Sequence, residues 1–322
     1  MWAQVLTAPK HFELQEIPAP RHDELVDGQV LVKLLAGAIC GSDLPNYRGR
    51  LSKYPGDGAA NAAQLPGFPL HEIVGEIVEA NGTDLEVGAR VAGWADLSNG
   101  LAEQFIDHAA ALITLESGID AVQATTIQPL ACVLHAVSRL PAIEGRRIAI
   151  IGLGPFGLLF GHVLKTRGAA HITGVDQIDR SDVAASFGID EPVWSSSDRW
   201  TQRLGEDDRA DIVIEAVGHQ ISTFNDAVEA VAPSGHIFYF GIADDLYYPF
   251  RFERFMRKHL TLASGTTQDQ RACLDEAAKY LKASPDLLTT FITNVFNVRD
   301  AQLAYELAGV PSRGRLKVAL SV

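Results

Sequence analysis

The sequence predicts an α/β protein of two domains, a mostly-β unit and a doubly wound parallel sheet. Three observations predict this fold class. A length of 322 residues matches about two domains of roughly 150 residues each. Roughly the first 140 residues hold short apolar runs separated by Gly, Pro, Asn and Asp, which is typical of a compact β unit. After about Pro141 strands alternate with helices, as in a parallel sheet with crossover helices.

The mostly-β unit draws on both ends of the chain. Strands are expected at residues 30–35, 73–78 and 90–94, where short runs are bounded by turn residues. Helices are expected at residues 274–281 and 300–308. A last strand at residues 316–320 needs a partner sheet, so we expect the C-terminus to return to the N-terminal unit.

The doubly wound part is predicted from alternating strand and helix patterns. In chain order we expect a strand at 148–151, a helix at 156–167, a strand at 172–176, a helix at 180–187 ended by Gly188, a strand at 211–216, a helix at 224–231 and a strand at 236–240. The longest apolar stretch, residues 148–164, is broken by glycines, Pro155 and His162. It falls short of the roughly 18 to 20 apolar residues of a membrane-spanning helix.

Composition limits the class of protein. The formal charge of −13 and pI near 5.2 argue against nucleic acid and anionic lipid as partners, because both attract positive surfaces. Hydrophobic residues make up 47% of the chain, enough for a core in each domain. Cys40, Cys132 and Cys273 are too few for a disulfide framework. The N-terminus lacks the pattern of a secretory signal, so we expect a reducing, cytoplasmic location.

A glycine-rich loop predicts a dinucleotide site. The pattern G-x-G-x-x-G at residues 152–157 follows a predicted strand and opens a predicted helix, where backbone N–H groups can bind a pyrophosphate. Asp176 ends the next strand, where a carboxylate can accept hydrogen bonds from ribose and repel a 2′-phosphate, which favours NAD over NADP. The expected cofactor-binding residues are Gly152, Gly154, Pro155, Phe156, Gly157, Asp176, Arg180, Val217 and Gly241.

A second candidate site precedes the nucleotide fold. Cys40 and His71 are zinc ligand types, and a catalytic zinc keeps one position open for water or substrate. Asp43 is a candidate acceptor for the ring N–H of His71, and Ser42 a candidate relay for a substrate proton. Cys132 and Cys273 have apolar neighbours and are expected to be packed thiols.

Several motifs together resemble the medium-chain dehydrogenase/reductase family, the zinc-type alcohol, polyol and sugar dehydrogenases. They are residues 37–43 (GAICGSD), 71–75 (HEIVG) with 87–91 (VGARV), the glycine loop with Asp176, and 316–318 (LKV). The resemblance implies a GroES-like catalytic domain of residues 1–138 and 272–322 and a Rossmann domain of residues 139–271. It also implies one catalytic zinc at Cys40 and His71, with Glu72 near or on the metal.

The chain departs from this family pattern at four places. Gln128 stands where the polyol branch has an acidic ligand, so three outcomes stay open: a loosely held metal, ligation by Glu72, or no metal. Pro45 replaces a proton-relay histidine, leaving Ser42, water, Asn46 or Tyr47 for that task. The lobe that binds a structural zinc is missing between residues 94 and 102. Residues 51–69 form an insertion expected beside the site.

The resemblance implies an enzyme that interconverts a secondary alcohol and its ketone by NAD-dependent hydride transfer, on a polyol, sugar or cyclitol. The first alternative is a zinc-independent NAD(P)H reductase of an activated C=C or C=N bond, which Gln128 and Pro45 favour. The second is a non-catalytic dinucleotide-binding protein. The expected assembly is a homodimer or homotetramer, because residues 237–241 and 246–250 lie where relatives pair their nucleotide-binding sheets.

Overall fold

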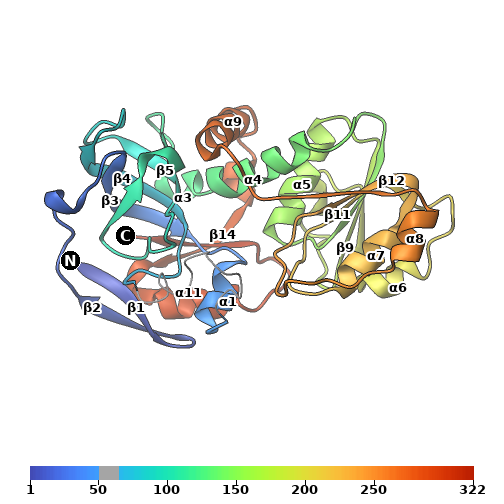
Figure 1. Ribbon diagram of the computed structural model, residues 1–322, viewed down its shortest axis with the longest axis horizontal. Helices are drawn as coiled ribbons and strands as arrows, with labels where there is room; N and C mark the ends of the chain where they lie inside the picture. The colour runs from blue at the N-terminus through green and yellow to red at the C-terminus, as the bar shows by residue number, and fades with distance from the viewer. Residues whose placement is uncertain (51–64) are drawn as a thin grey trace. The chain divides into compact units, whose positions relative to one another are not determined.

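The computed structural model describes residues 1–50 and 65–322 and contains two compact units (Figure 1). Unit 1 comprises Met1–Ala131, Gln268–Val310 and Arg315–Val322, and unit 2 comprises Cys132–Thr267 and Pro311–Gly314. The sequence placed the limits at residues 138/139 and 271/272. The structure places the first limit inside α4 (Ile127–Ser138), because the helix contributes its first turn to unit 1.

Unit 1 is built on a mixed sheet, as expected for its mostly-β part. In the described chain the strand order is β14-β15-β3-β4-β5-β7, and β6 pairs with β3. β14 and β15 are parallel and the other pairs are antiparallel. The strands are β3 (Gln29–Ala38), β4 (Glu72–Asn81), β5 (Arg90–Trp94), β6 (Gln104–His108), β7 (Leu112–Thr114), β14 (Ile292–Asn297) and β15 (Lys317–Ser321).

The C-terminus returns to the N-terminal sheet, as the sequence predicted, because β15 pairs with β3. A separate hairpin, β1 (Trp2–Ala8) and β2 (His11–Glu16), packs through Phe12 onto Tyr47 and Tyr305. The other elements of unit 1 are α1 (Asp43–Tyr47), α3 (Ala121–Ala124), α9 (Gln270–Ala283), α10 (Leu287–Thr290), α11 (Ala301–Ala308) and the 3-10 turns η1 (His22–Glu24), η2 (Ala109–Ala111) and η4 (Val298–Asp300).

Unit 2 contains the doubly wound parallel sheet. Its order is β10-β9-β8-β11-β12-β13 with all pairs parallel, so the winding reverses between β8 and β11. Such a reversal is where open α/β sheets bind dinucleotides. The strands are β8 (Arg147–Ile151), β9 (His171–Asp176), β10 (Glu191–Trp194), β11 (Ala210–Glu215), β12 (Val231–Tyr239) and β13 (Thr261–Ser264).

The crossovers of unit 2 are helical with one exception. They are α5 (Pro155–Thr166), α6 (Ser197–Thr201), α7 (Ser222–Ala230), α8 (Phe252–Arg257) and the 3-10 turn η3 (Ala184–Phe187). The prediction of a helix at residues 180–187 was wrong in its first half. The Asp179 side chain accepts from the N–H of Ser181 at 3.0 Å, an alternative to helical hydrogen bonding. Gly188 ends the turn at a φ of 71°.

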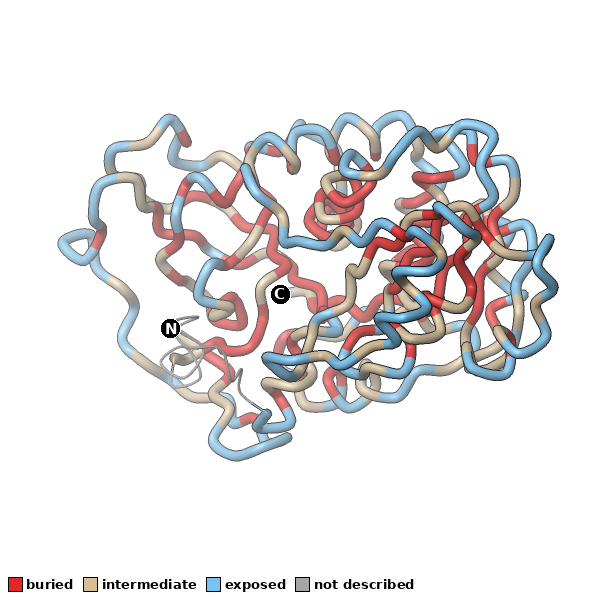
Figure 2. The backbone as a smooth tube through the Cα atoms, turned by 45° about the vertical axis from the view of Figure 1, so that its right-hand side comes forward, coloured by how far each residue is buried: buried red, intermediate tan, exposed pale blue. Residues whose placement is uncertain are grey.

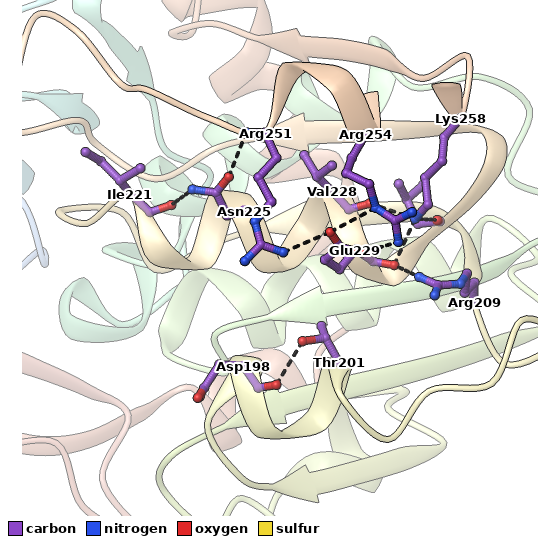
Figure 3. Close-up of polar contacts among 11 residues, drawn as sticks. Asp198, Thr201, Arg209, Ile221, Asn225, Val228, Glu229, Arg251, Arg254 and Lys258 are labelled. Carbon is purple, nitrogen blue, oxygen red and sulfur yellow. Dashed lines mark hydrogen bonds and ion pairs between the residues drawn. The ribbon is translucent and has the colours of Figure 1, made fainter. Parts of the chain in front are cut away.

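Charged side chains anchor the C-terminal end of α7 (Figure 3). Glu229 pairs with Arg251 and Arg254, each at an N–O distance of 3.0 Å. The ammonium of Lys258 donates to carbonyl oxygens at 2.7–2.9 Å, those of Val228, Glu229 and Val231. Carbonyls at the end of a helix lack an intrahelical N–H partner, so Lys258 supplies donors there, and the Arg209 guanidinium also donates to the Glu229 carbonyl.

Burial follows the sheets in both units. Buried residues concentrate in central strands such as β3 and β11 and in helices α4 and α5, and exposed segments alternate with buried ones along the backbone (Figure 2). One core cluster lies in unit 1 around Val32, Ile73 and Tyr305, and another in unit 2 around Val213 and Ile237. None of the described helices combines the length and apolar character needed to cross a membrane.

Candidate active site

Cys40, His71 and Glu72 lie together because two neighbouring strands deliver them. β3 ends at Ala38, just before Cys40, and β4 begins at Glu72, just after His71. In the antiparallel register Ala38 lies opposite Glu72. Ligand atoms of the three side chains all lie within 4.8 Å of one another. Within residues 1–50 and 65–322 they form the one group of His, Cys, Asp and Glu side chains close enough to hold a metal.

Asp43 orients the imidazole and the Cys40 backbone together. Its Oδ1 lies 2.7 Å from Nδ1 of His71, and its Oδ2 accepts a 2.8 Å hydrogen bond from the N–H of Cys40. Because Nδ1 is engaged, Nε2 is the ring nitrogen left for a metal. Burial opposes protonation of His71, but the Asp43 carboxylate and Cys40 outweigh it, so the pKa of His71 is raised well above its usual value.

Lys317 also reaches this cluster, although sequence analysis assigned it no role. β15 pairs with β3, which brings Nζ of Lys317 to 2.6 Å from Oε1 of Glu72, both side chains being almost fully buried. Burial lowers the pKa of Lys317, but Glu72 and Cys40 more than compensate, so it is raised. The detectable signal was a lysine inside the apolar run at residues 316–320.

Tyr305 is the second residue that sequence analysis missed. It is fully buried on α11, and its hydroxyl donates to the carbonyl of Pro69. Burial, followed by the negative charge of Asp43, raises its pKa well above the usual value. A tyrosine in an amphipathic helix carries no sequence signal for such a position.

The buried donor set fits a divalent metal ion. Asp43 pairs with His71 and Lys317 pairs with one oxygen of Glu72, so the Cys40 thiol and the second Glu72 oxygen are the groups of the cluster outside these two pairs. Oε2 of Glu72 is buried and has no hydrogen-bond partner in the described part of the chain. Thiolate sulfur, imidazole nitrogen and carboxylate oxygen are the donors that zinc binds in proteins.

The remaining expected residues of this site lie near helix starts. Gln128 is buried on the first turn of α4, and Ser42 is half-buried just before α1. Pro45 lies inside α1 and offers no proton-carrying group. Tyr47, one of the relay candidates, is buried and donates its hydroxyl to the carbonyl of Lys10 at 3.2 Å. The expected insertion at residues 51–69 lies, up to residue 64, outside the described residues.

The glycine loop has the backbone shape of a phosphate site. Gly152 has a φ of 94°, which favours glycine, and a Cβ on Gly157 would meet the carbonyl oxygen of Gly152 at 1.8 Å. A Cβ on Gly154, by contrast, would meet nothing within 4 Å. No side chain caps α5, which begins at Pro155, so its first-turn N–H groups, including that of Phe156, can bind an anion.

Asp176 ends β9 beside this loop. Its Oδ2 accepts from the N–H of Leu153 and its Oδ1 from the N–H of Ile178, each at 2.7 Å. An ionised carboxylate has about four lone-pair sites, so both oxygens can still accept from a ribose. The side chain therefore joins the glycine loop to the end of β9.

The other expected cofactor residues, Arg180, Val217 and Gly241, differ in their burial and in their contacts. Arg180 is only 4% exposed, and its guanidinium donates to the carbonyl of Ser312 at 2.9 Å, so it is engaged within unit 2. Val217 is exposed, and its Cγ2 would lie 2.6 Å from a Cβ on Gly152. Gly241 follows β12 and adjoins the loop after β11.

Two family models match the chain. The model described as an alcohol dehydrogenase GroES-like domain matches residues 26–124, and the one described as a zinc-binding dehydrogenase matches residues 155–282. The first covers the Cys40 and His71 region, and the second begins at Pro155, within the glycine loop, and includes Asp176.

Known proteins match over almost the whole chain. D-arabinitol dehydrogenase 1 of Uromyces fabae is 26% identical, with 99% of this chain and 97% of that protein covered. Sorbitol dehydrogenase of Halalkalibacterium halodurans is 26% identical, with 97% and 96% covered. The solved structure of alcohol dehydrogenase TADH from Thermus sp. ATN1 superposes with a TM-score of 0.83 at 25% identity and covers 100% of both chains.

Proposed function

The chain belongs to the zinc-type alcohol dehydrogenases of the medium-chain dehydrogenase/reductase family and is an oxidoreductase, and we propose that it interconverts a secondary alcohol and its ketone by hydride transfer with NAD. One zinc ion would be held by Cys40 and His71, with Glu72 or Gln128 as a further ligand. The observation that carries the proposal is the buried Cys40, His71 and Glu72 group in a chain that also has the glycine loop and Asp176.

The protein's own groups prepare this chemistry. A bound zinc supplies Lewis acidity, which lowers the pKa of an alcohol. Asp43 holds the His71 ring through Nδ1 at 2.7 Å, which leaves Nε2 as the nitrogen for ligation on the side of Cys40, and Lys317 holds one oxygen of Glu72 at 2.6 Å. Ser42, half-buried before α1, is the proposed first acceptor of the alcohol proton, because Pro45 cannot carry it.

The cofactor proposal rests on unit 2. The open N-terminus of α5 would bind the pyrophosphate, and Asp176 would accept hydrogen bonds from the adenosine ribose. A carboxylate at that position repels a 2′-phosphate, so we propose NAD rather than NADP. The nicotinamide accepts or donates the hydride when the cofactor is bound.

The substrate class comes from the relatives. The arabinitol and sorbitol dehydrogenases act, by their names, on polyols. Because this chain matches them over nearly its full length, we propose a small polyol, sugar or cyclitol as substrate. The proposed assembly is a homo-oligomer, and the proposed location is cytoplasmic, since all three cysteines are free.

The experiment combines metal analysis with a substrate panel. Protein purified without chelator should contain about one zinc per chain and oxidise one or more polyols, sugars or cyclitols, with NAD better than NADP. The variant Cys40→Ser should lose the zinc and about 100-fold or more of kcat/KM, because the thiolate ligand is gone.

The matched control is Cys273→Ser. This half-buried thiol donates to the carbonyl of Gln268, so its replacement should leave zinc content and turnover unchanged. A zinc-free protein that fully reduces activated C=C or C=N bonds would contradict the proposal in favour of the reductase alternative. NADH binding without turnover on alcohols, ketones, enones and imines would favour the non-catalytic alternative.

A further inference from the structure

Glu215 is a buried carboxylate at the C-terminal end of β11 that the proposed reaction does not use. Its side chain has no exposed surface. Oε1 accepts hydrogen bonds from the Thr223 hydroxyl at 2.7 Å, the N–H of Gly218 at 3.0 Å and the N–H of Val217 at 3.2 Å. The Gly218 N–H also lies 3.3 Å from Oε2. All these donors are neutral.

A carboxylate is a costly choice for this position. Burial raises the pKa of Glu215, and the hydrogen bonds from Thr223, Gly218 and Val217 offset this only in part, so the pKa stays above its usual value. An apolar side chain could fill the same space without the cost of desolvating a charge. It could not, however, accept two successive backbone N–H groups and a hydroxyl. The carboxylate therefore acts on the conformation of the loop at residues 216–218.

This loop is the middle one of three that adjoin one another. A Cβ on Gly241, in the loop after β12, would lie 2.2 Å from the nitrogen of Gly218 and 2.7 Å from Oε2 of Glu215. A Cβ on Gly152, in the loop after β8, would lie 2.6 Å from Cγ2 of Val217. Glu215 thus lies where the loops after β8, β11 and β12 pack together without room for side chains.

The loops after β11 and β12 follow strands on the side of the sheet where one half of a bound dinucleotide would lie. β9, which carries Asp176, lies on one side of β8, and β11 and β12 lie on the other. A dinucleotide bound at such a sheet extends across the point where the strand order reverses, here between β8 and β11. With the adenosine ribose at Asp176, the other half of the cofactor lies over the loops after β11 and β12.

We propose that Glu215 is a positioning residue for the nicotinamide half of the cofactor. It holds the loop at residues 216–218 directly, and it holds the loop after β12 through the contact between Gly218 and Gly241. The inference rests on the proposed binding of a nicotinamide dinucleotide, and it adds a residue that never touches the cofactor.

The test compares binding of NADH with binding of AMP, which is the adenosine half alone, by isothermal titration calorimetry. Glu215→Gln replaces one accepting oxygen by an NH2 group that faces backbone donors. We expect the Kd for NADH to rise about tenfold and the Kd for AMP to stay within about twofold. Asp176→Ala is the comparator, and it should weaken both ligands, because the adenosine ribose loses its acceptor.

Thr223 supplies a second, milder pair of variants. Thr223→Val keeps the shape of the side chain but removes the 2.7 Å donor, so it should raise the NADH Kd about threefold without changing AMP binding. Thr223→Ser restores a hydroxyl and should restore the Kd. If Glu215→Gln does not fold, the two Thr223 variants alone test whether the hydrogen bonds to Glu215 affect NADH binding.

Each outcome has one meaning. Equal weakening of NADH and AMP in Glu215→Gln, or unchanged NADH binding in both Glu215→Gln and Thr223→Val, would overturn the role of Glu215. Failure of the wild-type protein to bind NADH or NADPH would instead overturn the proposed function. Where NADPH binds more tightly than NADH, the same comparison is made with NADPH.

Discussion

Gln128 occupies a buried position on the first turn of α4 and carries an amide in place of the acid found in the polyol branch of the family. An amide oxygen is a neutral donor and holds a divalent cation less strongly than a carboxylate. Cys40, His71 and Glu72 already lie together as candidate ligands, and Lys317 pairs with one of the two Glu72 oxygens. The identity of this one side chain is therefore expected to set metal affinity.

We predict that Gln128→Glu tightens zinc binding at least about tenfold, roughly 1.4 kcal/mol. The added carboxylate gives zinc a charged oxygen ligand. Competition with a chromophoric chelator measures the change. Gln202→Glu adds the same charge at the exposed end of α6 and should leave zinc affinity unaltered. Equal affinities for wild type and Gln128→Glu would show that residue 128 is no ligand.

Asp107 on β6 is another buried acid, and its burial affects how the stability of the protein depends on pH. It is 3% exposed, and its Oδ1 accepts from the N–H of Asp96 and of His108 at 3.2 and 2.9 Å. Its Oδ2 is buried without a hydrogen-bond partner in the described residues. Burial and then the charge of Asp96 raise the pKa of Asp107 well above its usual value.

A raised carboxyl pKa makes stability fall as pH rises. Between the usual pKa and the raised one, the folded protein keeps a proton that the unfolded chain releases. We therefore predict that Asp107→Asn raises the thermal midpoint at pH 7 by about 2–4 °C, for about 1 kcal/mol, and by less at pH 4. Asp84→Asn, which breaks an ion pair with Arg271, should not stabilise at pH 7. Destabilisation by Asp107→Asn at pH 7 would contradict the argument.

At the scale of elements, strand pairing assembles both candidate sites. β3, β4 and β15 lie side by side and bring Cys40, Glu72 and Lys317 together from the two ends of the chain. The ends of β8, β9, β11 and β12 bring the glycine loop to Asp176 and Glu215. Each of these strands was recognisable in the sequence from its apolar pattern, because periodicity is local. Which ends meet depends on register, which is not local.

At the scale of the whole molecule, each of the two large sheets ends in two edge strands in the described chain. β10 and β13 end the parallel sheet of unit 2, and β14 and β7 end the sheet of unit 1. Around β13 several large apolar side chains are exposed, with Leu262 at 41%, Phe252 at 62% and Met256 at 55%. An open strand edge with apolar neighbours can pair with a second copy about a two-fold axis.

Residues 237–239, part of the segment from which sheet pairing was expected, lie on β12 between β11 and β13 and have no free edge, so we predict a homodimer through β13 instead. Light scattering should give twice the chain mass of 34.8 kDa. Leu262→Lys should give the monomer mass, because a charged edge residue opposes strand pairing. Val295→Lys makes the same change on β14 and should leave the dimer intact. A dimer that survives Leu262→Lys but not Val295→Lys would place the interface on unit 1.

Local sequence patterns were sufficient to predict much of the fold and several residues of the candidate sites. Alternating apolar runs indicated the two kinds of sheet, the glycine spacing indicated the loop that opens α5, and residue type made Cys40 and His71 candidate metal ligands. Only the tertiary structure decided that Lys317 pairs with Glu72, that Tyr305 is buried with its hydroxyl on the Pro69 carbonyl, that residues 180–183 are not helical, and that Glu215 accepts hydrogen bonds from the loop at residues 216–218. The reason is physical: backbone periodicity and side-chain chemistry act over a few residues, whereas the partners of a buried charge are set by strand register and loop packing between distant segments.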